Sequence, residues 1–234
     1  MAKIWVIQHH PVENLGNIAD ALEGAALAWQ YVRVFDGHPI PADMKGAGGL
    51  ILMGGPQSVY DAEQDFPTLK AEMRLIESAL KDNRPVLGVC LGSQILAAAL
   101  GAKVYKGARR EIGWHPVRLT PEAGDDRLLA GAPAEFTAFH WHGDIFDLPK
   151  DAVALASSEI SPVQAFRYGD KAYGFLCHLE VSETSVHAMV REFTDAAKHA
   201  SLRSAILDNI ENVEPLSEIA EEVFLRWARP IQGT

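Results

Sequence analysis

The sequence predicts an α/β fold in which a mostly parallel central sheet carries helices on both faces. Two observations support this prediction. Over the first hundred residues, short apolar runs rich in β-branched side chains alternate with segments of helical spacing. Such alternation is typical of right-handed βαβ units, which build a parallel sheet covered on both faces. A chain of 234 residues, 48% of them hydrophobic, can also bury the sizeable core that such a sheet requires.

Strands and helices are expected to alternate before residue 85. Apolar runs indicate the strands, and apolar residues three or four positions apart indicate the helices. Turn residues such as Asp36 and Gly37 separate the segments. The expected order is Ile4–Ile7 (strand), Asn14–Trp29 (helix), Tyr31–Phe35 (strand), Gly49–Met53 (strand) and Leu69–Leu80 (helix).

The next stretch predicts a buried strand, a sharp turn and a helix. Val86–Val89 is short and apolar, and Ile95–Leu100 consists of strong helix formers that end at Gly101. Cys90 lies between strand and helix, where the positive end of the helix favours a thiolate. Glycines two residues to either side remove Cβ atoms from a crowded turn, as in the nucleophile elbow of Gly-x-Ser-x-Gly enzymes. The alternative is a buried and inert thiol.

The second half of the chain is richer in strands and returns to helices near its end. The expected strands are Lys103–Tyr105, Trp114–Leu119, Phe136–Phe139, Val153–Ala156, Val163–Arg167 and Ala172–Cys177, and the expected helices are Val186–Lys198 and Leu216–Trp227. No repeat or flexible linker interrupts the sequence, so residues 1–234 are expected to form one domain. Its motif-bearing core spans about 3–195, followed by a C-terminal helical layer at about 196–234. The expected architecture is a flavodoxin-like sandwich of three layers with a smaller strand-rich extension.

Composition argues against several classes of function. The net charge of −10 disfavours nucleic acid or an anionic membrane surface as the main partner. No apolar run reaches roughly 18 residues, so no membrane span is expected. The apolar run Ile4–Ile7 is too short for the core of a signal peptide. With Cys90 and Cys177 as the only cysteines, we expect a reducing, cytoplasmic setting rather than a disulfide.

A cysteine nucleophile needs a general base, and the base needs an orienting group. His178 follows an apolar strand, and Glu180 lies two residues further on. Residues two apart on an extended backbone point the same way, so His178 can face Cys90 while Glu180 approaches the other imidazole nitrogen. The alternative is a polar, solvent-exposed loop after the strand.

Acyl chemistry also needs donors for an oxyanion. The residue after an elbow nucleophile supplies one backbone N–H, which here is that of Leu91. Gly55 is the candidate for the second donor, because glycine can turn its N–H inward with unusual backbone angles. The alternative for Gly54-Gly55-Pro56 is a plain turn.

Taken together, these segments resemble class I glutamine amidotransferase domains, and most closely the glutaminase part of GMP synthetase, over roughly residues 3–195. The resemblance implies that Cys90, His178 and Glu180 form a triad and that Gly55 and Leu91 form the oxyanion hole. It places Gln94, Gly143 and Asp144 near bound glutamine. The motifs that carry it are Gly88-Val89-Cys90-Leu91-Gly92-Ser93-Gln94, Gly54-Gly55-Pro56-Gln57-Ser58-Val59-Tyr60, Trp141-His142-Gly143-Asp144 and His178-Leu179-Glu180.

Two departures from the family pattern stand beside these motifs. Leu176 and Cys177 replace the usual Gln and aromatic residue before the histidine, and Leu179 replaces the usual Pro after it. Trp141 stands where many members carry a small polar residue, so it is expected to reshape the substrate pocket.

Other polar residues receive a structural interpretation. His140 and His142 share one face of a strand and could form a metal site with His115, but the sequence offers no further obvious ligand. We therefore expect packing or pocket-lining roles for these histidines, and neither a metal nor a cofactor. Arg109-Arg110 is expected to be a solvated turn.

The sequence leaves three functions open. The first is hydrolysis of the γ-amide of glutamine through a γ-glutamyl thioester, with ammonia passing to a separate synthetase partner, since the motifs are not followed by an ATP-binding synthetase domain. The second is hydrolysis of γ-glutamyl peptides. The third is a non-catalytic regulatory protein that retains the fold, which an intact triad argues against.

Overall fold

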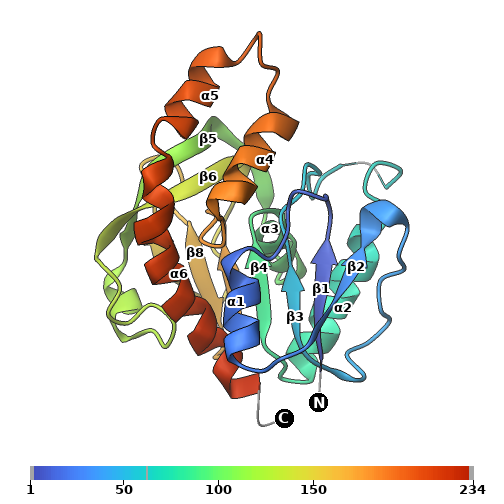
Figure 1. The fold of residues 1–234 in the computed structure, drawn as a ribbon. Coiled ribbons are helices and arrows are strands. Elements are labelled where there is room, and N and C mark those ends of the chain that lie inside the picture. The colour runs from blue at the N-terminus through green and yellow to red at the C-terminus, as the bar shows by residue number, and fades with distance from the viewer. Residues whose placement is uncertain (1–2, 62, 232–234) are drawn as a thin grey trace.

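The computed structural model describes residues 3–61 and 63–231, and within them nine strands form a single sheet (Figure 1). The strand order is β2-β1-β3-β4-β9-β8-β7-β5-β6. The strands are β1 (Lys3–Gln8), β2 (Trp29–Arg33), β3 (Ala47–Leu52), β4 (Val86–Val89), β5 (Val104–Leu119), β6 (Glu135–Phe146), β7 (Ala152–Ser157), β8 (Ala165–Tyr168) and β9 (Ala172–Phe175). The α-helices are α1 (Asn17–Gly24), α2 (Leu69–Lys81), α3 (Leu91–Ala99), α4 (Glu183–Phe193), α5 (Ala200–Leu207) and α6 (Val213–Ala228).

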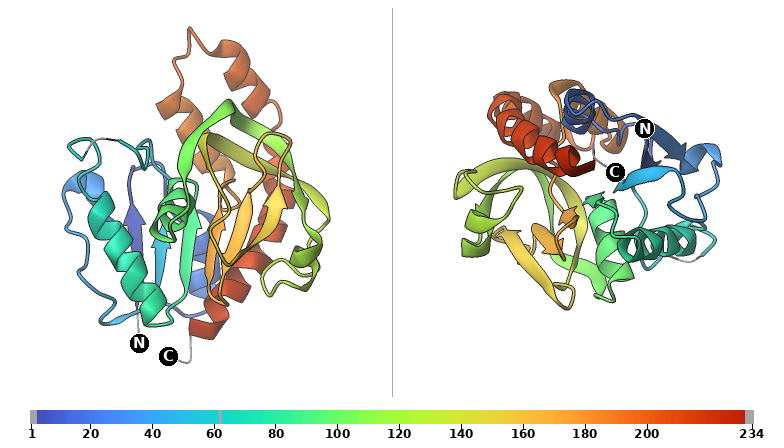
Figure 2. Two further views of the ribbon diagram at one scale, coloured as in Figure 1. Left: turned by 180° about the vertical axis from the view of Figure 1, so that it is seen from behind. Right: turned by 90° about the horizontal axis from the view of Figure 1, so that it is seen from below.

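The five strands from β2 to β9 pair in parallel and are covered by helices on both faces. Leu50 and Leu52 pack with the side chains of α2 and α3, whereas Ile51 and Met53 pack with those of α1 and α6. Alternate residues of a strand point to opposite faces, which explains this division. Figure 2 shows α2 and α3 on one side of these strands and α1 and α6 on the other. For this half of the sheet, the expected three layers are observed.

The expectation of a mostly parallel sheet is not confirmed. From β9 onward, the pairs β8–β9, β7–β8, β5–β7 and β5–β6 are all antiparallel, so the sheet is mixed. β5 is one long strand, where the sequence predicted two short ones. The polar residues 106–111 obscured this continuity, since they contain no apolar alternation. Arg109 and Arg110 accordingly belong to β5 and not to a turn.

The helices also differ from the predicted spans. α1 begins at Asn17 instead of Asn14, because Gly16 adopts a left-handed φ of 47° and Asn17 N donates to Glu180 O at 2.8 Å. The short helix α5 was not predicted as a separate element, although it lies within the helical layer expected at about 196–234. α6 packs along α1, and its buried apolar residues belong to the same cluster as the central strands. Among the described residues, every helix is too short or too polar to cross a lipid bilayer.

Candidate active site

Cys90 occupies a strained turn between β4 and α3. Its φ of 49° and ψ of −109° are unusual for a residue with a side chain. Its backbone N–H donates to Phe175 O of β9 at 2.8 Å, and its Sγ lies 3.8 Å from the carbonyl oxygen of Trp141. The side chain is nearly buried but still reaches a pocket. A cysteine held this way at a helix N-terminus is suited to act as a nucleophile.

The two flanking glycines are required by the close approach of α3 to the sheet. A Cβ on Gly92 would lie 2.0 Å from Leu52 O, and one on Gly88 would lie 2.5 Å from Gly92 O. No real Cβ tolerates such distances to backbone atoms. The Gly-x-Cys-x-Gly spacing therefore follows from the packing of this turn, as the sequence indicated.

His178 and Glu180 lie just beyond the end of β9, next to the strand that leads to Cys90. His178 Nδ1 is 2.7 Å from Glu180 Oε1, and both side chains are buried. The backbone fixes both residues, because His178 N donates to Phe139 O and Glu180 O accepts from Asn17 N, each at 2.8 Å. His178 Nε2 has no hydrogen-bond partner among the described residues, so this nitrogen is available for proton transfer.

The electrostatics of this group favour a protonated imidazole. Burial lowers the pKa of His178, but the charges of Glu180 and of a Cys90 thiolate outweigh it and raise this pKa well above its usual value. Cys177, the neighbouring residue, behaves differently. Complete burial raises the pKa of the Cys177 thiol, so it stays protonated and inert.

Gly55 and Leu91 are close together beside Cys90. A Cβ on Gly55 would lie 2.8 Å from Leu91 Cδ2 and 2.6 Å from the Cβ of His9. Leu91 is the first residue of α3, so its N–H has no acceptor within that helix.

Behind the loop that contains Gly55, His9 contacts Met53 O at 3.0 Å and Glu72 at 2.8 Å in a fully buried arrangement. Charge attraction to Glu72 raises the pKa of His9, although burial opposes this.

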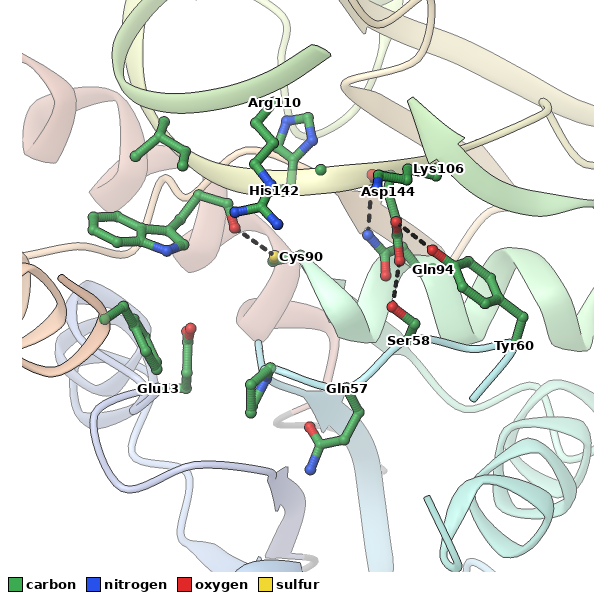
Figure 3. Close-up of a pocket in the computed structure, with 16 residues that line it drawn as sticks. Glu13, Gln57, Ser58, Tyr60, Cys90, Gln94, Lys106, Arg110, His142 and Asp144 are labelled. Carbon is green, nitrogen blue, oxygen red and sulfur yellow. Dashed lines mark hydrogen bonds between the residues drawn. The ribbon is translucent and has the colours of Figure 1, made fainter. Parts of the chain in front are cut away.

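A pocket of about 340 Å³ opens over Cys90 (Figure 3). All four residues predicted near the substrate line it, namely Gln94, Trp141, Gly143 and Asp144. Gly55 and Cys90 also line it, as do Pro56, Gln57, Ser58 and Tyr60 of the same motif and His142, for which a packing or pocket-lining role was expected. The sequence did not indicate the remaining lining residues, which are Glu13, Lys106, Arg110, Ile112 and Phe193.

Asp144 organises one wall of the pocket. Its carboxylate accepts from Ser58 Oγ at 2.6 Å and from Tyr60 OH at 2.7 Å, while its backbone oxygen accepts from Gln94 Nε2 at 3.2 Å (Figure 3). Ser58 and Tyr60 follow Gly55 in the same loop. The contacts to Asp144 therefore tie the loop that carries Gly55 to the end of β6.

Charged residues from distant elements meet at this pocket. Lys106 and Arg110 come from β5, and Glu13 comes from the loop after β1. The Glu13 carboxylate packs against Gly54, where a Cβ would lie 2.4 Å from it. Burial raises the pKa of Glu13; the charge of His178 opposes this, and the charge of Glu180 adds to it. No spacing rule in the sequence links these residues, because only the folded sheet brings them together.

The arrangement combines a thiol on a strained backbone turn, an oriented imidazole, and two backbone N–H groups, that of Leu91 at the start of a helix and that of Gly55 in the neighbouring loop. Attack on a carbonyl carbon, proton transfer to a leaving group and stabilisation of an oxyanion need these three components. The charged pocket indicates a small polar substrate. The geometry thus supports acyl transfer from an amide or ester.

Comparison with known proteins gives a consistent result. The family model for "Glutamine amidotransferase class-I" matches residues 13–196. A glutamine amidotransferase-like protein of Salmonella typhimurium, YfeJ, is 32% identical over 222 residues, which cover 92% of this chain and 93% of that protein. The glutamine-hydrolysing GMP synthase of Porphyromonas gingivalis is 36% identical over 153 residues, or 64% of this chain. That match spans only 28% of the synthase's own length.

Solved structures agree with the sequence matches. A glutamine amidotransferase from Thermotoga maritima superposes with a TM-score of 0.87 at 30% identity, covering 97% of this chain and 98% of the other. One from Methylobacillus flagellatus superposes with a TM-score of 0.86 at 30% identity, covering 97% and 94% of the two chains. These matches extend through α6, well beyond the residues that carry the motifs.

Proposed function

Since the chain belongs to the class I glutamine amidotransferase family, we propose that it hydrolyses the γ-amide of glutamine through Cys90, His178 and Glu180. The Cys90 thiolate attacks the amide carbon, and His178 protonates the leaving nitrogen, which departs as ammonia. Water, deprotonated by His178, then releases glutamate from the γ-glutamyl thioester. Gly55 and Leu91 donate their N–H groups to the oxyanion of both tetrahedral intermediates.

One observation carries this proposal. Cys90 lies on a strained elbow at the end of β4, and the adjacent strand β9 leads into a buried His178. Its Nδ1 is bonded to Glu180, and its Nε2 has no partner within residues 3–61 and 63–231. A protein with a purely structural role has no reason to keep a strained cysteine beside a buried imidazole with a free nitrogen. This feature supports an active enzyme over a regulatory protein that retains the fold.

We further propose that the ammonia serves an acceptor enzyme, which acts as a separate partner. GMP synthase, one of the matched proteins, is named as glutamine-hydrolysing. In the proposed partnership, binding of the acceptor enzyme changes the loop from Gly54 to Tyr60. This loop contains Gly55 and is held to Asp144 by side-chain contacts.

A second substrate class, γ-glutamyl peptides, is supported by the charges of the pocket. Lys106 and Arg110 supply two cations at its wall, more than the single α-carboxylate of glutamine requires. The additional cation would bind the carboxylate of a residue attached to the γ-glutamyl group. A volume of about 340 Å³ lies within the usual range for small-molecule sites, from about 300 to 1,000 Å³.

A covalent probe tests the nucleophile. A glutamine-analogue electrophile is expected to label Cys90 and spare Cys177. The full-length protein is labelled and then digested, and mass spectrometry of its peptides identifies the labelled cysteine. Cys177→Ser is the matched control and should be labelled as fast as the unaltered protein. Preferential labelling of Cys177 would refute the assignment.

Steady-state kinetics distinguishes the substrates. A partner-dependent glutaminase is expected to turn over free glutamine slowly and to gain kcat when the acceptor synthetase is added. Without any partner, a peptidase is expected to show a higher kcat/KM on γ-glutamyl peptides than on free glutamine. Arg110→Gln should lower the kcat/KM on these peptides. Fast hydrolysis of glutamine alone, unaffected by a partner, would contradict both versions.

A further inference from the structure

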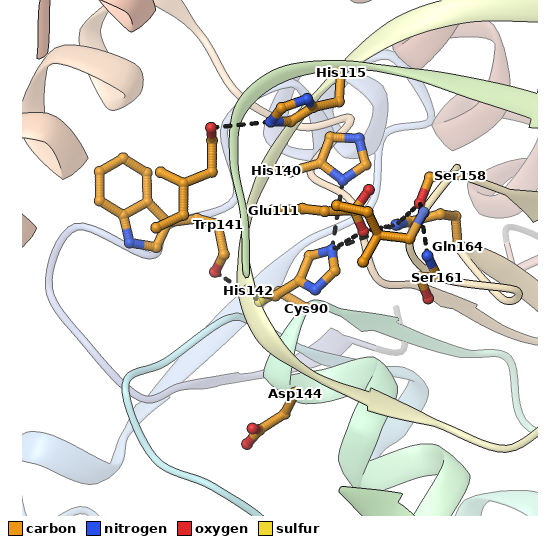
Figure 4. A network of polar contacts seen from close by, with 12 residues as sticks. Cys90, Glu111, His115, His140, Trp141, His142, Asp144, Ser158, Ser161 and Gln164 are labelled. Carbon is orange, nitrogen blue, oxygen red and sulfur yellow. Dashed lines mark hydrogen bonds and ion pairs between the residues drawn. The ribbon is translucent and has the colours of Figure 1, made fainter. Parts of the chain in front are cut away.

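A second polar cluster extends inward from the pocket wall, which its member His142 helps to line, and has no role in the proposed reaction. Glu111 of β5 meets His140 and His142 of β6, and Gln164 approaches from the residue before β8 (Figure 4). All four residues are buried, with exposed fractions between 0% and 6%. A buried group of this kind must be satisfied internally, because unpaired polar atoms in a protein interior are costly.

Hydrogen bonds alone do not satisfy the cluster. Three polar atoms converge on His142 Nε2, namely Glu111 Oε2 at 3.3 Å, Gln164 Nε2 at 3.4 Å and His140 Nδ1 at 3.5 Å. A ring nitrogen offers either one proton or one lone pair. It can therefore make one good hydrogen bond. All three contacts are longer than the usual donor–acceptor distance of such bonds, which is about 2.7–3.2 Å.

The same distances fit coordination of a metal ion. Ligands about 2.0–2.2 Å from a tetrahedral ion lie about 3.3–3.6 Å from one another. The contacts from His142 Nε2 to Glu111 and to His140 have these lengths, and the ligand atoms of all three residues lie within 4.8 Å of one another. Two imidazole nitrogens and one carboxylate oxygen are the donors that Zn²⁺ accepts.

Gln164 supplies a fourth donor. Its Oε1 has no hydrogen-bond partner within the described part of the chain, whereas its Nε2 donates to Glu111 at 2.8 Å and to Ser158 Oγ at 3.1 Å. The oxygen and nitrogen of an amide exchange places by rotation of its terminal group. After that rotation, Oε1 faces the centre of the cluster. Its backbone is held rigidly, with Gln164 N donating to Ala156 O at 2.7 Å and Gln164 O accepting from Leu176 N at 2.8 Å.

We propose that Glu111, His140, His142 and Gln164 form a structural site for a zinc ion. The ion would join β5, β6 and the segment before β8, three parts of the antiparallel half of the sheet. Trp141 lies between the two histidines, and its carbonyl oxygen is the atom that contacts Cys90 Sγ. A bound ion thus fixes the strand that forms the wall opposite the nucleophile, and with four protein donors it takes no part in the chemistry.

Metal analysis tests this site directly. The untagged protein is stripped with a chelator, reconstituted with Zn²⁺ and passed through gel filtration, and about one zinc ion per chain is expected. At free Zn²⁺ about 100 times the dissociation constant, the melting temperature is expected to rise by about 5–10 °C, and Mg²⁺ is expected to cause no such shift. Unaltered protein that retains no zinc, or that responds equally to Mg²⁺, would overturn the proposal.

Variants locate the ion. His140→Gln and Glu111→Gln are expected to lose the bound zinc and the thermal shift. His115→Gln is the matched control, since its ring lies 5.5 Å from that of His140 but its Nε2 is engaged with Ile112 O at 3.0 Å. It should retain both. Folding of each variant is checked by circular dichroism, and a folded His140→Gln protein that binds as much zinc as the unaltered chain would refute the site. If either variant does not fold, the visible spectrum of Co²⁺ bound to the unaltered protein is measured instead. The spectrum of a tetrahedral nitrogen–oxygen site is expected, and an octahedral spectrum would refute the site.

Discussion

Replacing Gly92 by alanine should both destabilise the protein and impair its active site. The added Cβ would lie 2.0 Å from the backbone oxygen of Leu52, so α3 must move away from β3 by at least about 1 Å. Overpacking of this kind costs about 1–3 kcal/mol, only partly offset by the better helix propensity of alanine, which is worth about 1 kcal/mol at most. The net cost is therefore up to about 3 kcal/mol, and since each kcal/mol shifts the melting temperature of a chain of this size by about 2–4 °C, we expect that temperature to fall by up to about 12 °C.

Catalysis should suffer more than stability, because Cys90 is the N-cap of the displaced helix. Misplacement of a reacting group by about 1 Å can lower the rate by about 10²-fold. Calorimetry gives the melting temperature, and glutamine hydrolysis gives kcat for the same preparation. Gly124→Ala is the matched control, since nothing lies within 4 Å of the Cβ it would add. A Gly92→Ala protein with unchanged stability and turnover would refute this account of the elbow.

Further predictions concern the residues around Cys90. His178→Ala is expected to abolish turnover, whereas Glu180→Gln keeps the imidazole in place and should leave measurable kcat; the opposite ranking would contradict the roles assigned to them. Glu180→Gln also removes a charge that raises the pKa of His178, so the alkaline limb of the kcat/KM profile should move to lower pH, and an unmoved limb would argue against this coupling. Gly55→Pro removes one backbone N–H and should lower kcat by about 10²–10³-fold in a variant whose circular dichroism is unchanged; normal turnover would exclude Gly55 as a donor. The raised folded-state pKa of His9 means that its stabilising contribution is complete below its unfolded value of about 6.5 and is lost as the pH rises through the folded value. His9→Gln should therefore flatten the dependence of melting temperature on pH above about 6.5, and parallel curves for the two proteins would refute this.

Local sequence determined the parts of the structure that depend on neighbouring residues. The Gly-x-Cys-x-Gly turn could be predicted because steric crowding at a strand-to-helix elbow depends on residues two apart, and Gly88 and Gly92 are both needed for it. Likewise, the hydrogen bond between His178 and Glu180 follows from their separation by two residues. The parallel strands β3, β4 and β9 were recognised because their apolar runs are buried on both faces.

The tertiary structure alone decided which distant residues share a site. β5 pairs with β6 on either side of its polar centre, over residues 104–106 and 111–118, and no local pattern in residues 106–111 reveals this partner. That pairing brings Lys106 and Arg110 to the pocket and Glu111 to the two histidines of β6. Hydrophobic periodicity records which face of an element is buried, but it carries no information on which polar residues of other elements meet there. Strand register fixes those encounters, and it is set by long-range pairing in the folded chain.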